Sequence, residues 1–248
     1  MQTARGLEGL ERTDRPVFVV VGVFDGLHLG HAYLLEHLVR EASARDARPM
    51  VITFDHHPDE VLVGAAPPLL VHPDERLERL AAAGVGVTVV QHFDEAVRRT
   101  PYDAFVERIR ARTALAGLLM TPDAAFGFER RGTPEALAEL GARVGFDVVV
   151  VPTFDLDGRA VRSSDIRAAI ERGDLASAGE LLGRPLSLRG ELTEGGALHI
   201  DWPMAMPPDG TYPCVVDGVD AVLRIADSGV RVDGAPRADG SAEVVLRG

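Results

Sequence analysis

The sequence contains no lysine and no asparagine, so all 26 of its basic residues are arginine. Without a lysine side chain the protein cannot use the lysine of a Walker A loop, a Schiff base with a carbonyl substrate, or a lysine nucleophile. Contacts to phosphate groups must then come from arginine, histidine, hydroxyl groups, backbone N–H groups or a metal ion.

Cysteine is almost absent as well, because Cys214 is the single thiol in 248 residues. One cysteine excludes an internal disulfide and is typical of a reducing compartment. No apolar run approaches the roughly 18 residues of a membrane span, and residues 1–16 contain no apolar segment of the kind that a secretory signal carries. We therefore expect a cytoplasmic protein that has no membrane partner.

Positive charge is in deficit overall. The formal net charge is -12 and the isoelectric point is about 5.1, which disfavours attraction to nucleic acid. The chain is 46% hydrophobic and 26% charged, a composition that supports the full core of a globular protein. We expect small-molecule partners and no nucleic acid, and the sequence leaves the oligomeric state open.

Apolar runs of strand length alternate with segments of helical pattern as far as residue 182. The runs are continuous in valine, isoleucine and leucine, which favours strands buried on both faces. Strands that alternate with helices predict an α/β fold with a Rossmann-like, doubly wound parallel sheet. The predicted strands are 17–23, 49–54, 85–90, 115–120 and 146–151, and the predicted helices are 30–44, 73–83, 101–112, 134–144, 163–172 and 175–182.

After Pro185 the pattern changes to short alternating strands separated by turn pairs, such as Asp217-Gly218 and Ser228-Gly229. This pattern predicts a small C-terminal antiparallel β module. The expected organisation is an N-terminal tail (1–16), a first domain (17–186) and the β module (187–248).

The stretch GVFDGLHLGHAYLL begins where the first predicted strand ends and continues into the first predicted helix. Backbone N–H groups and the helix dipole make such a junction an anion site, and its glycines allow a tight turn. His28 and His31 are three residues apart, a spacing that places two side chains on one face of a helical turn. Two imidazoles there suit a phosphoryl group that gains charge in its transition state. A polar cap or a pair of metal ligands is the alternative interpretation.

This HxGH stretch resembles the signature of a nucleotidyltransferase superfamily. Three further stretches narrow the resemblance to the adenylyltransferase module of the bacterial bifunctional riboflavin kinase/FAD synthetases. That family's strand with a His-Pro turn is similar to VITFDHHPDEVL, residues 51–62. Its Phe-Gly loop is similar to AFGFERRGTPEAL, residues 125–137. Its Ser-Ser/Thr-x-Ile-Arg motif is similar to VRSSDIRAAIERGDLASAGELLGRPL, residues 161–186.

The resemblance implies transfer of AMP from ATP to the phosphate of FMN, giving FAD and pyrophosphate, with Mg²⁺ as cofactor. Such a reaction needs positioning and charge stabilisation but no protein nucleophile, because the attacking oxygen is already on the acceptor. The resemblance assigns catalysis to His28, His31 and Arg167. It assigns ATP binding to Gly22, Phe24, Asp25, Gly30, His57, Ser163 and Ser164, and it places Asp123 and Phe126 beside the flavin or acceptor. Arg162 replaces the first serine of the family's Ser-Ser-Thr run and adds positive charge next to the phosphates, so we expect it to contact the acceptor.

Three of these residues have a second interpretation. Asp25 either reaches a metal ion or caps its turn. His57 either contacts a phosphate or ribose group or holds its own turn. Asp123 either lies near the flavin or caps a helix or turn. The resemblance predicts no definite set of metal ligands.

Besides Arg162, the chain departs from the family's pattern in two regions. Ala124 stands where the family commonly has the first aromatic residue of the Phe-Gly loop, which alters the surface on which a flavin ring would stack. The 187–206 segment lacks the Pro-Thr-Ala-Asn kinase motif, so we expect no riboflavin kinase activity from a shortened barrel. The alternatives are an enzyme with the same mechanism and another phosphorylated acceptor, and a paralogue that binds flavin or nucleotide without turnover.

Overall fold

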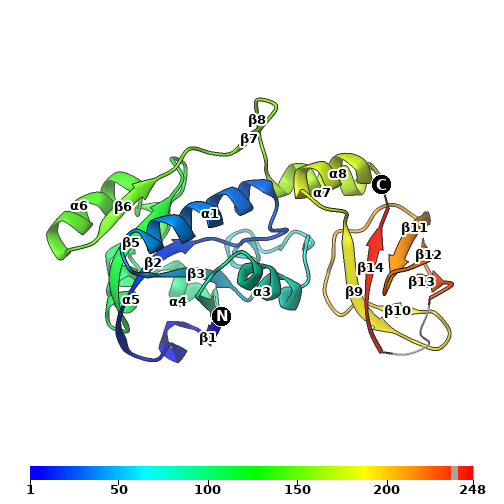
Figure 1. Ribbon diagram of the computed structural model, residues 1–248, viewed down its shortest axis with the longest axis horizontal. Coiled ribbons are helices and arrows are strands. Elements are labelled where there is room, and N and C mark those ends of the chain that lie inside the picture. Colours follow the sequence, from blue (N-terminus) through cyan, green and yellow to red (C-terminus); the bar gives the residue numbers. More distant parts are fainter. Residues whose placement is uncertain (236–239, 248) are drawn as a thin grey trace. The chain divides into compact units, whose positions relative to one another are not determined.

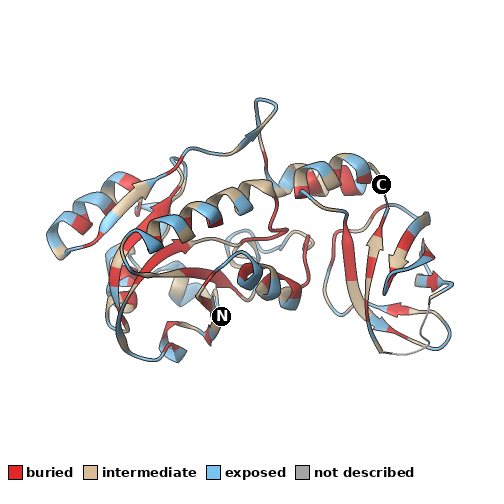
Figure 2. Ribbon diagram, in the orientation of Figure 1, coloured by how far each residue is buried: buried red, intermediate tan, exposed pale blue. Residues whose placement is uncertain are grey.

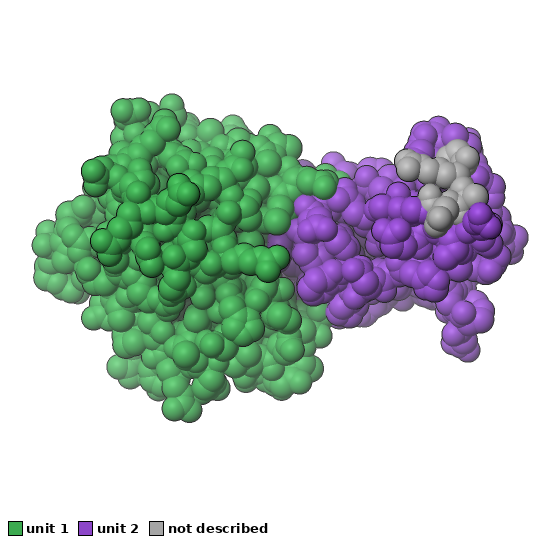
Figure 3. Space-filling model, turned by 90° about the horizontal axis from the view of Figure 1, so that it is seen from below, with its two compact units in different colours: residues 1–24, 31–67, 77–154 green, residues 25–30, 68–76, 155–248 purple. Residues whose placement is uncertain are grey.

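Figure 1 shows a computed structural model of the chain, which describes residues 1–235 and 240–247. The chain forms two compact units, coloured separately in Figure 3. Unit 1 contains residues 1–24, 31–67 and 77–154, and unit 2 contains residues 25–30, 68–76 and 155–248. Each unit therefore combines segments that lie far apart in the sequence. The predicted domain boundary between residues 186 and 187 stays a prediction.

Unit 1 is built on a six-stranded parallel sheet with the order β1-β4-β3-β2-β5-β6. The chain runs from β2 outward through β3 to β4 and then crosses to β5 and β6 on the other side, so the strand order reverses between β2 and β5. The predicted doubly wound parallel sheet is confirmed. Its strands are β1 (Gln2–Arg5), β2 (Thr13–Val21), β3 (Arg48–Phe54), β4 (Val87–Gln91), β5 (Thr113–Met120) and β6 (Asp147–Val150).

Helices connect the strands of this sheet. They are α1 (Leu29–Ser43), α2 (Asp59–Leu62), α3 (Pro73–Ala82), α4 (Glu95–Arg98), α5 (Tyr102–Arg110) and α6 (Pro134–Val144), with 3-10 turns at Leu7–Gly9 and Phe128–Arg130. The four longer helices of the sequence prediction begin and end within two residues of these bounds. The single-turn helices α2 and α4 are too short for a periodic pattern, and the sequence did not predict them.

The second half of strand β2, residues 17–20, is buried on both faces, as its continuous apolar sequence predicts (Figure 2). Val17 and Val19 belong to a core cluster that includes side chains of α5 and α6. Phe18 alternates with them, and the guanidinium carbon of Arg45, which follows α1, lies 4.8 Å from the Phe18 ring centroid. These three strand residues are at most 1% exposed. The sheet is therefore covered by helical segments on its two sides.

The structure differs from the expectation of an N-terminal tail. Residues 2–5 form the edge strand β1, which pairs in parallel with β4. Leu7 and Leu10 are at most 3% exposed and pack in the core of unit 1. A four-residue strand carries too little periodicity to be recognised in the sequence, and pairing with β4 is what makes it a strand.

Unit 2 contains an antiparallel sheet with the order β10-β9-β14-β11-β12-β13. Its two edges meet, because Ala197 bridges to Arg231 and the Val232 N–H donates to the Gly196 carbonyl at 2.7 Å. The predicted antiparallel module is confirmed and forms a small barrel. Its strands are β9 (Ser187–Leu192), β10 (Leu198–His199), β11 (Gly210–Val216), β12 (Val219–Ala226), β13 (Gly229–Asp233) and β14 (Gly240–Leu246).

Two helices and a short hairpin precede the barrel in unit 2. The hairpin consists of β7 (Asp155–Leu156) and β8 (Arg159–Ala160), and the helices are α7 (Ser163–Glu171) and α8 (Leu175–Leu182). Both helices match their predicted positions. Among the described residues, no helix combines the length and the apolar character needed to cross a membrane.

Candidate active site

The segment between β2 and α1 is a buried turn with an unfavourable backbone conformation. Phe24, Gly26 and Leu27 have φ angles of 54°, 82° and 42°. Such angles suit glycine but cost energy for phenylalanine and leucine, and conformations of this kind concentrate at functional sites. The turn leads directly into the first turn of α1, where backbone N–H groups have no partner within the helix. The prediction of an anion site at this junction therefore has a local structural basis.

His28 lies one residue before α1 begins, and it is only 5% exposed. A Cβ atom at Gly30 would lie 3.2 Å from two atoms of the His28 ring, so glycine leaves the space that the imidazole needs. Burial, and to a lesser extent the charge of Arg184, lowers the pKa of His28 to about 4. The imidazole is consequently neutral near pH 7 in the chain without a ligand.

His31 lies within α1 and belongs to unit 1. Its ring centroid is 5.1 Å from that of Phe24, with an angle of 46° between the ring planes. Phe24 is 1% exposed, and a Cβ atom at Gly22 would lie 3.1 Å from its ring. Gly22 thus makes room for the aromatic ring against which His31 packs.

Asp25 and Arg167 form a buried ion pair in unit 2. The Asp25 Oδ2 accepts a hydrogen bond from Arg167 Nη2 at 2.5 Å, and Oδ1 accepts one from the Leu70 N–H at 2.9 Å. Arg167 Nε also donates to the Pro68 carbonyl at 2.7 Å. The side chains are 2% and 12% exposed, respectively. Both oxygens of Asp25 are engaged, so this residue links the turn to the 68–70 loop and to α7.

Helix α7 begins beside the same turn. Ser163 Oγ donates to the Asp25 carbonyl at 3.1 Å, whereas Ser164 and the N-cap residue Arg162 are exposed. Arg184, which follows α8, donates to the Gly26 carbonyl at 2.7 Å and to a second carbonyl of the turn at 3.4 Å. Sequence reasoning did not predict Arg184 as a site residue. The only available signal was its place in the closing Leu-Leu-Gly-Arg-Pro stretch.

A cavity of about 540 Å³ lies in unit 1, lined by the carboxyl ends of β2 and β5, where the strand order reverses. Ligands of doubly wound sheets bind at this place, and the volume lies within the range of small-molecule sites. Its lining is mostly apolar and includes the aromatic residues Phe54, Phe93, Phe105, Phe126 and Phe128. Arg98 and Arg130 also line it, together with the carboxylates of Asp59 and Glu129. Arg130 lies in the 125–137 stretch that resembles the Phe-Gly loop, whereas Arg98 lies in none of the quoted motifs.

His57 lines the cavity and also supports its own turn. Its Nδ1 accepts a hydrogen bond from the Asp59 N–H at 3.2 Å and lies 3.5 Å from a carboxylate oxygen of the same residue. Asp123 is exposed and is not among the lining residues. Its Oδ1 accepts a hydrogen bond from Thr121 Oγ1 at 2.8 Å, and its carbonyl accepts one from Arg130 at 3.0 Å. These contacts favour the interpretation of Asp123 as a turn cap.

The predicted site residues fall into two groups, one in each unit. Their roles towards ATP and the acceptor stay predictions. Unit 1 holds Gly22, Phe24, His31, His57, Asp123 and Phe126, and unit 2 holds Asp25, His28, Gly30, Arg162, Ser163, Ser164 and Arg167.

The parallel sheet and the histidine turn at the start of its first crossover helix define a nucleotidyltransferase. The pattern of the FAD synthetase family matches residues 10–165. The bifunctional riboflavin kinase/FMN adenylyltransferase of Haemophilus influenzae is 32% identical over 200 residues, which cover 80% of this chain and 65% of that protein. The Escherichia coli protein of the same description is 31% identical over 231 residues, which cover 90% and 72%. The chain belongs to the FAD synthetase family, and it spans about two thirds of the length of these relatives.

A solved structure has the same fold. The macrolide-efflux protein from Streptococcus pneumoniae aligns with a TM-score of 0.83 and 23% sequence identity, over 99% of this chain and 88% of that chain. At this level of identity the likeness concerns the fold alone.

Replacing Arg167 by alanine should lower the free energy of unfolding by about 3 kcal/mol, because it leaves the Asp25 carboxylate buried without its counter-charge. Urea denaturation measures this change. Arg172→Ala, at the exposed end of α7, is the matched control and should change stability by less than about 0.5 kcal/mol. Equal effects of the two substitutions would contradict the role of the ion pair.

The lowered pKa of His28 predicts a loss of stability in acid. In the unfolded chain His28 binds a proton below its ordinary pKa of 6.5, whereas in the folded chain it binds one only near pH 4. The contribution of His28 to the free energy of unfolding is therefore complete above pH 6.5, and it declines as the pH falls from 6.5 towards 4. The limiting slope is about 1.4 kcal/mol per pH unit. The exchange His28→Gln should flatten the stability profile between pH 6.5 and 4.5, and the exposed-site control His199→Gln should not. Parallel profiles for wild type and His28→Gln would refute the assignment.

Proposed function

We propose that this chain transfers the AMP group of ATP to the phosphate of FMN, giving FAD and pyrophosphate. The observation that carries the proposal is the apolar cavity at the strand-order reversal. Gly22 and Val23 line this cavity, and the residues that follow them directly in the chain, Phe24 to His31, form the histidine turn. An acceptor pocket and a phosphate site therefore share one continuous backbone segment. Membership of the FAD synthetase family supports the same reaction.

The lining of the cavity suits an acceptor that has a flat ring system and an anionic group. Phe126 packs against Phe105 with the ring centroids 5.5 Å apart, which gives part of the wall a fixed aromatic surface. Arg98 and Arg130 have guanidinium groups that can pair with a phosphate. Arg98 also pairs with Glu95 and Arg130 also donates to the Asp123 carbonyl, so a phosphate would share these groups. FMN combines these two features.

In the proposed reaction an oxygen of the acceptor phosphate forms a bond to the α-phosphorus of ATP, and the bond from that phosphorus to pyrophosphate breaks. The protein has to align the two substrates and stabilise the charge of the transition state. In the proposed reaction His28 and His31 supply imidazole groups that stabilise the reacting phosphate. The turn supplies backbone N–H groups, and the start of α7 supplies the hydroxyl group of Ser164. Arg167 positions the turn through its contact with Asp25.

The described turn does not offer Mg²⁺ a ready carboxylate ligand. Asp25 is the acidic residue of the turn, and its two oxygens accept hydrogen bonds from Arg167 and Leu70. Mg²⁺ commonly keeps several water ligands and binds to substrate phosphates. We therefore propose that Mg²⁺ enters as the complex with ATP.

One observation favours a second candidate, an enzyme with the same mechanism and a different phosphorylated acceptor. Ala124 lines the cavity at the position where the resemblance leads one to expect an aromatic side chain. The methyl group of Ala124 fills less of the cavity than an aromatic ring would. The cavity could therefore hold an acceptor that is not a flavin.

The functional test offers the purified chain ATP and Mg²⁺ with FMN, with riboflavin, or with a panel of other phosphorylated compounds, and measures pyrophosphate. We expect pyrophosphate and FAD with FMN, and no FMN from riboflavin. Because His31 is proposed to stabilise the reacting phosphate, His31→Ala should lower turnover at least about 100-fold with an unchanged circular dichroism spectrum. Pyrophosphate release with another phosphorylated acceptor but not with FMN would favour the second candidate. Tight flavin binding without turnover would favour a non-catalytic paralogue. Formation of FMN from riboflavin would refute the absence of kinase activity.

The cavity itself is tested by filling it. Ala125 lines the cavity, so Ala125→Trp should raise the KM for the acceptor at least about tenfold while ATP binding is retained. Ala138 is exposed on α6, and Ala138→Trp is the matched control that should leave both values unchanged. If Ala125→Trp leaves acceptor kinetics at the wild-type level, the acceptor does not bind in this cavity.

A further inference from the structure

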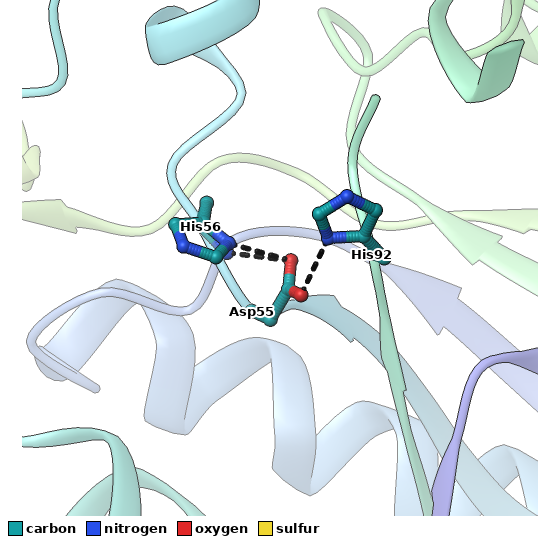
Figure 4. Close-up of side chains that lie close together, drawn as sticks. All are labelled: Asp55, His56 and His92. Atoms are coloured by element: carbon teal, nitrogen blue, oxygen red, sulfur yellow. Dashed lines mark hydrogen bonds and ion pairs between the residues drawn. The ribbon is translucent and has the colours of Figure 1, made fainter. Parts of the chain in front are cut away.

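Three side chains of metal-binding type meet in unit 1, and none of them has a role in the proposed transfer. They are Asp55, His56 and His92 (Figure 4). Each offers one ligand atom, and these atoms lie within 4.8 Å of one another. The Asp55 carboxylate contacts both rings, with Oδ2 at 2.7 Å from His92 Nδ1 and Oδ1 at 3.1 Å from His56 Nδ1.

The register of the sheet brings these residues together. Strands β3 and β4 pair in parallel, and their last register partners are Phe54 and Gln91. Asp55 and His92 are the next residue of each strand, so they leave the carboxyl edge of the sheet side by side. The Asp55 N–H donates to the Gln91 carbonyl at 3.2 Å, which continues the pairing by one step. Two of the three ligands are thus fixed by a core sheet rather than by free loops.

Hydrogen bonds and packing hold the cluster from the protein side. Asp55 Oδ1 accepts hydrogen bonds from the backbone N–H groups of His56 at 2.8 Å and Phe93 at 3.4 Å. The rings of Phe54 and Phe93 pack edge to face, with centroids 5.3 Å apart. The backbone on both sides of the three ligands is therefore anchored, which lowers the entropy lost when an ion binds.

The donor set determines the kind of ion. Two imidazole nitrogens and one carboxylate oxygen suit zinc and neighbouring divalent transition metals, whereas Mg²⁺ prefers oxygen ligands. Donor atoms at roughly 2.1 Å from a tetrahedral zinc ion lie about 3.4 Å apart. The three donor atoms lie within 4.8 Å of one another, so they have to settle near this separation when an ion binds. If Asp55 binds through Oδ2, its 2.7 Å contact with His92 has to widen by roughly 0.7 Å, which the 63% exposed side chain of His92 allows.

We propose that Asp55, His56 and His92 form a binding site for a divalent transition metal ion of the zinc type. The protein supplies three ligands, and water occupies the remaining coordination positions, because the His56 and His92 side chains are 47% and 63% exposed. None of the three residues is assigned to ATP or to the acceptor, although their neighbours Phe54, His57 and Phe93 line the cavity. The proposal rests on the three side chains alone and does not depend on the proposed function.

The test uses the full chain after treatment with a chelator and its removal. Zn²⁺ is titrated by calorimetry at neutral pH, and Co²⁺ is followed by its visible absorption. We expect one Zn²⁺ per chain, a Co²⁺ spectrum of low coordination number, and no competition from Mg²⁺. His56→Ala and His92→Ala should each weaken Zn²⁺ binding at least tenfold, and the double variant should lose the Co²⁺ spectrum.

The matched control is His199→Ala, which removes an exposed histidine of the barrel and should leave the titration unchanged. Circular dichroism on each variant establishes that it is folded. A second double variant, His56→Gln with His92→Gln, replaces the imidazoles by side chains of similar size. A wild-type chain that binds no stoichiometric Zn²⁺ would overturn the proposal. Zn²⁺ binding of equal strength in the wild type and in either double variant would overturn it too, because the ion would then be bound elsewhere.

Discussion

The buried carboxylate of Asp25 is the contact on which the candidate phosphate site depends. The histidine turn contains two non-glycine residues in the left-handed region, an arrangement that is unfavourable by itself. Asp25 holds the turn against Arg167 and the Leu70 N–H, and Arg184 binds two of its carbonyl groups. A charge that is almost fully removed from water keeps its partner close, because separating the pair leaves an uncompensated charge. The unfavourable backbone of the turn therefore persists.

This arrangement also explains how an acidic chain without lysine can receive a polyphosphate. Arg167 and Arg184 at the turn donate to protein acceptors. The groups proposed to meet an anion there are therefore backbone N–H groups, the imidazoles of His28 and His31, and the start of α7. Preoriented dipoles of this kind need no reorganisation when charge develops on a ligand. The cavity of unit 1 works by another principle, because it offers shape and apolar surface to a ring system.

The C-terminal barrel belongs to the same compact unit as the turn. Ser187, at the start of β9, donates to the carboxylate of Glu75 at 3.0 Å, and Leu69 bridges to Met204. The loop that carries Leu69 and Leu70 therefore contacts the barrel on one side and Asp25 on the other. The barrel contacts the 68–70 loop, and this loop in turn binds Asp25 of the histidine turn. The barrel therefore helps to hold the turn in place even though it lacks the kinase motif.

The sequence by itself determined five of the six strands of the parallel sheet, the antiparallel character of the C-terminal module and the place of the histidine turn. Hydrophobic periodicity, turn pairs that contain glycine and short motifs are local properties of the chain. Only the tertiary structure decided which distant groups meet. Asp25 and Arg167 are 142 residues apart, Arg184 and Gly26 are 158 apart, and Asp55 and His92 are 37 apart. Edge strand β1 exists through its pairing with β4. Such contacts depend on strand order and register, which arise when the whole core packs and leave no mark in any short stretch of residues.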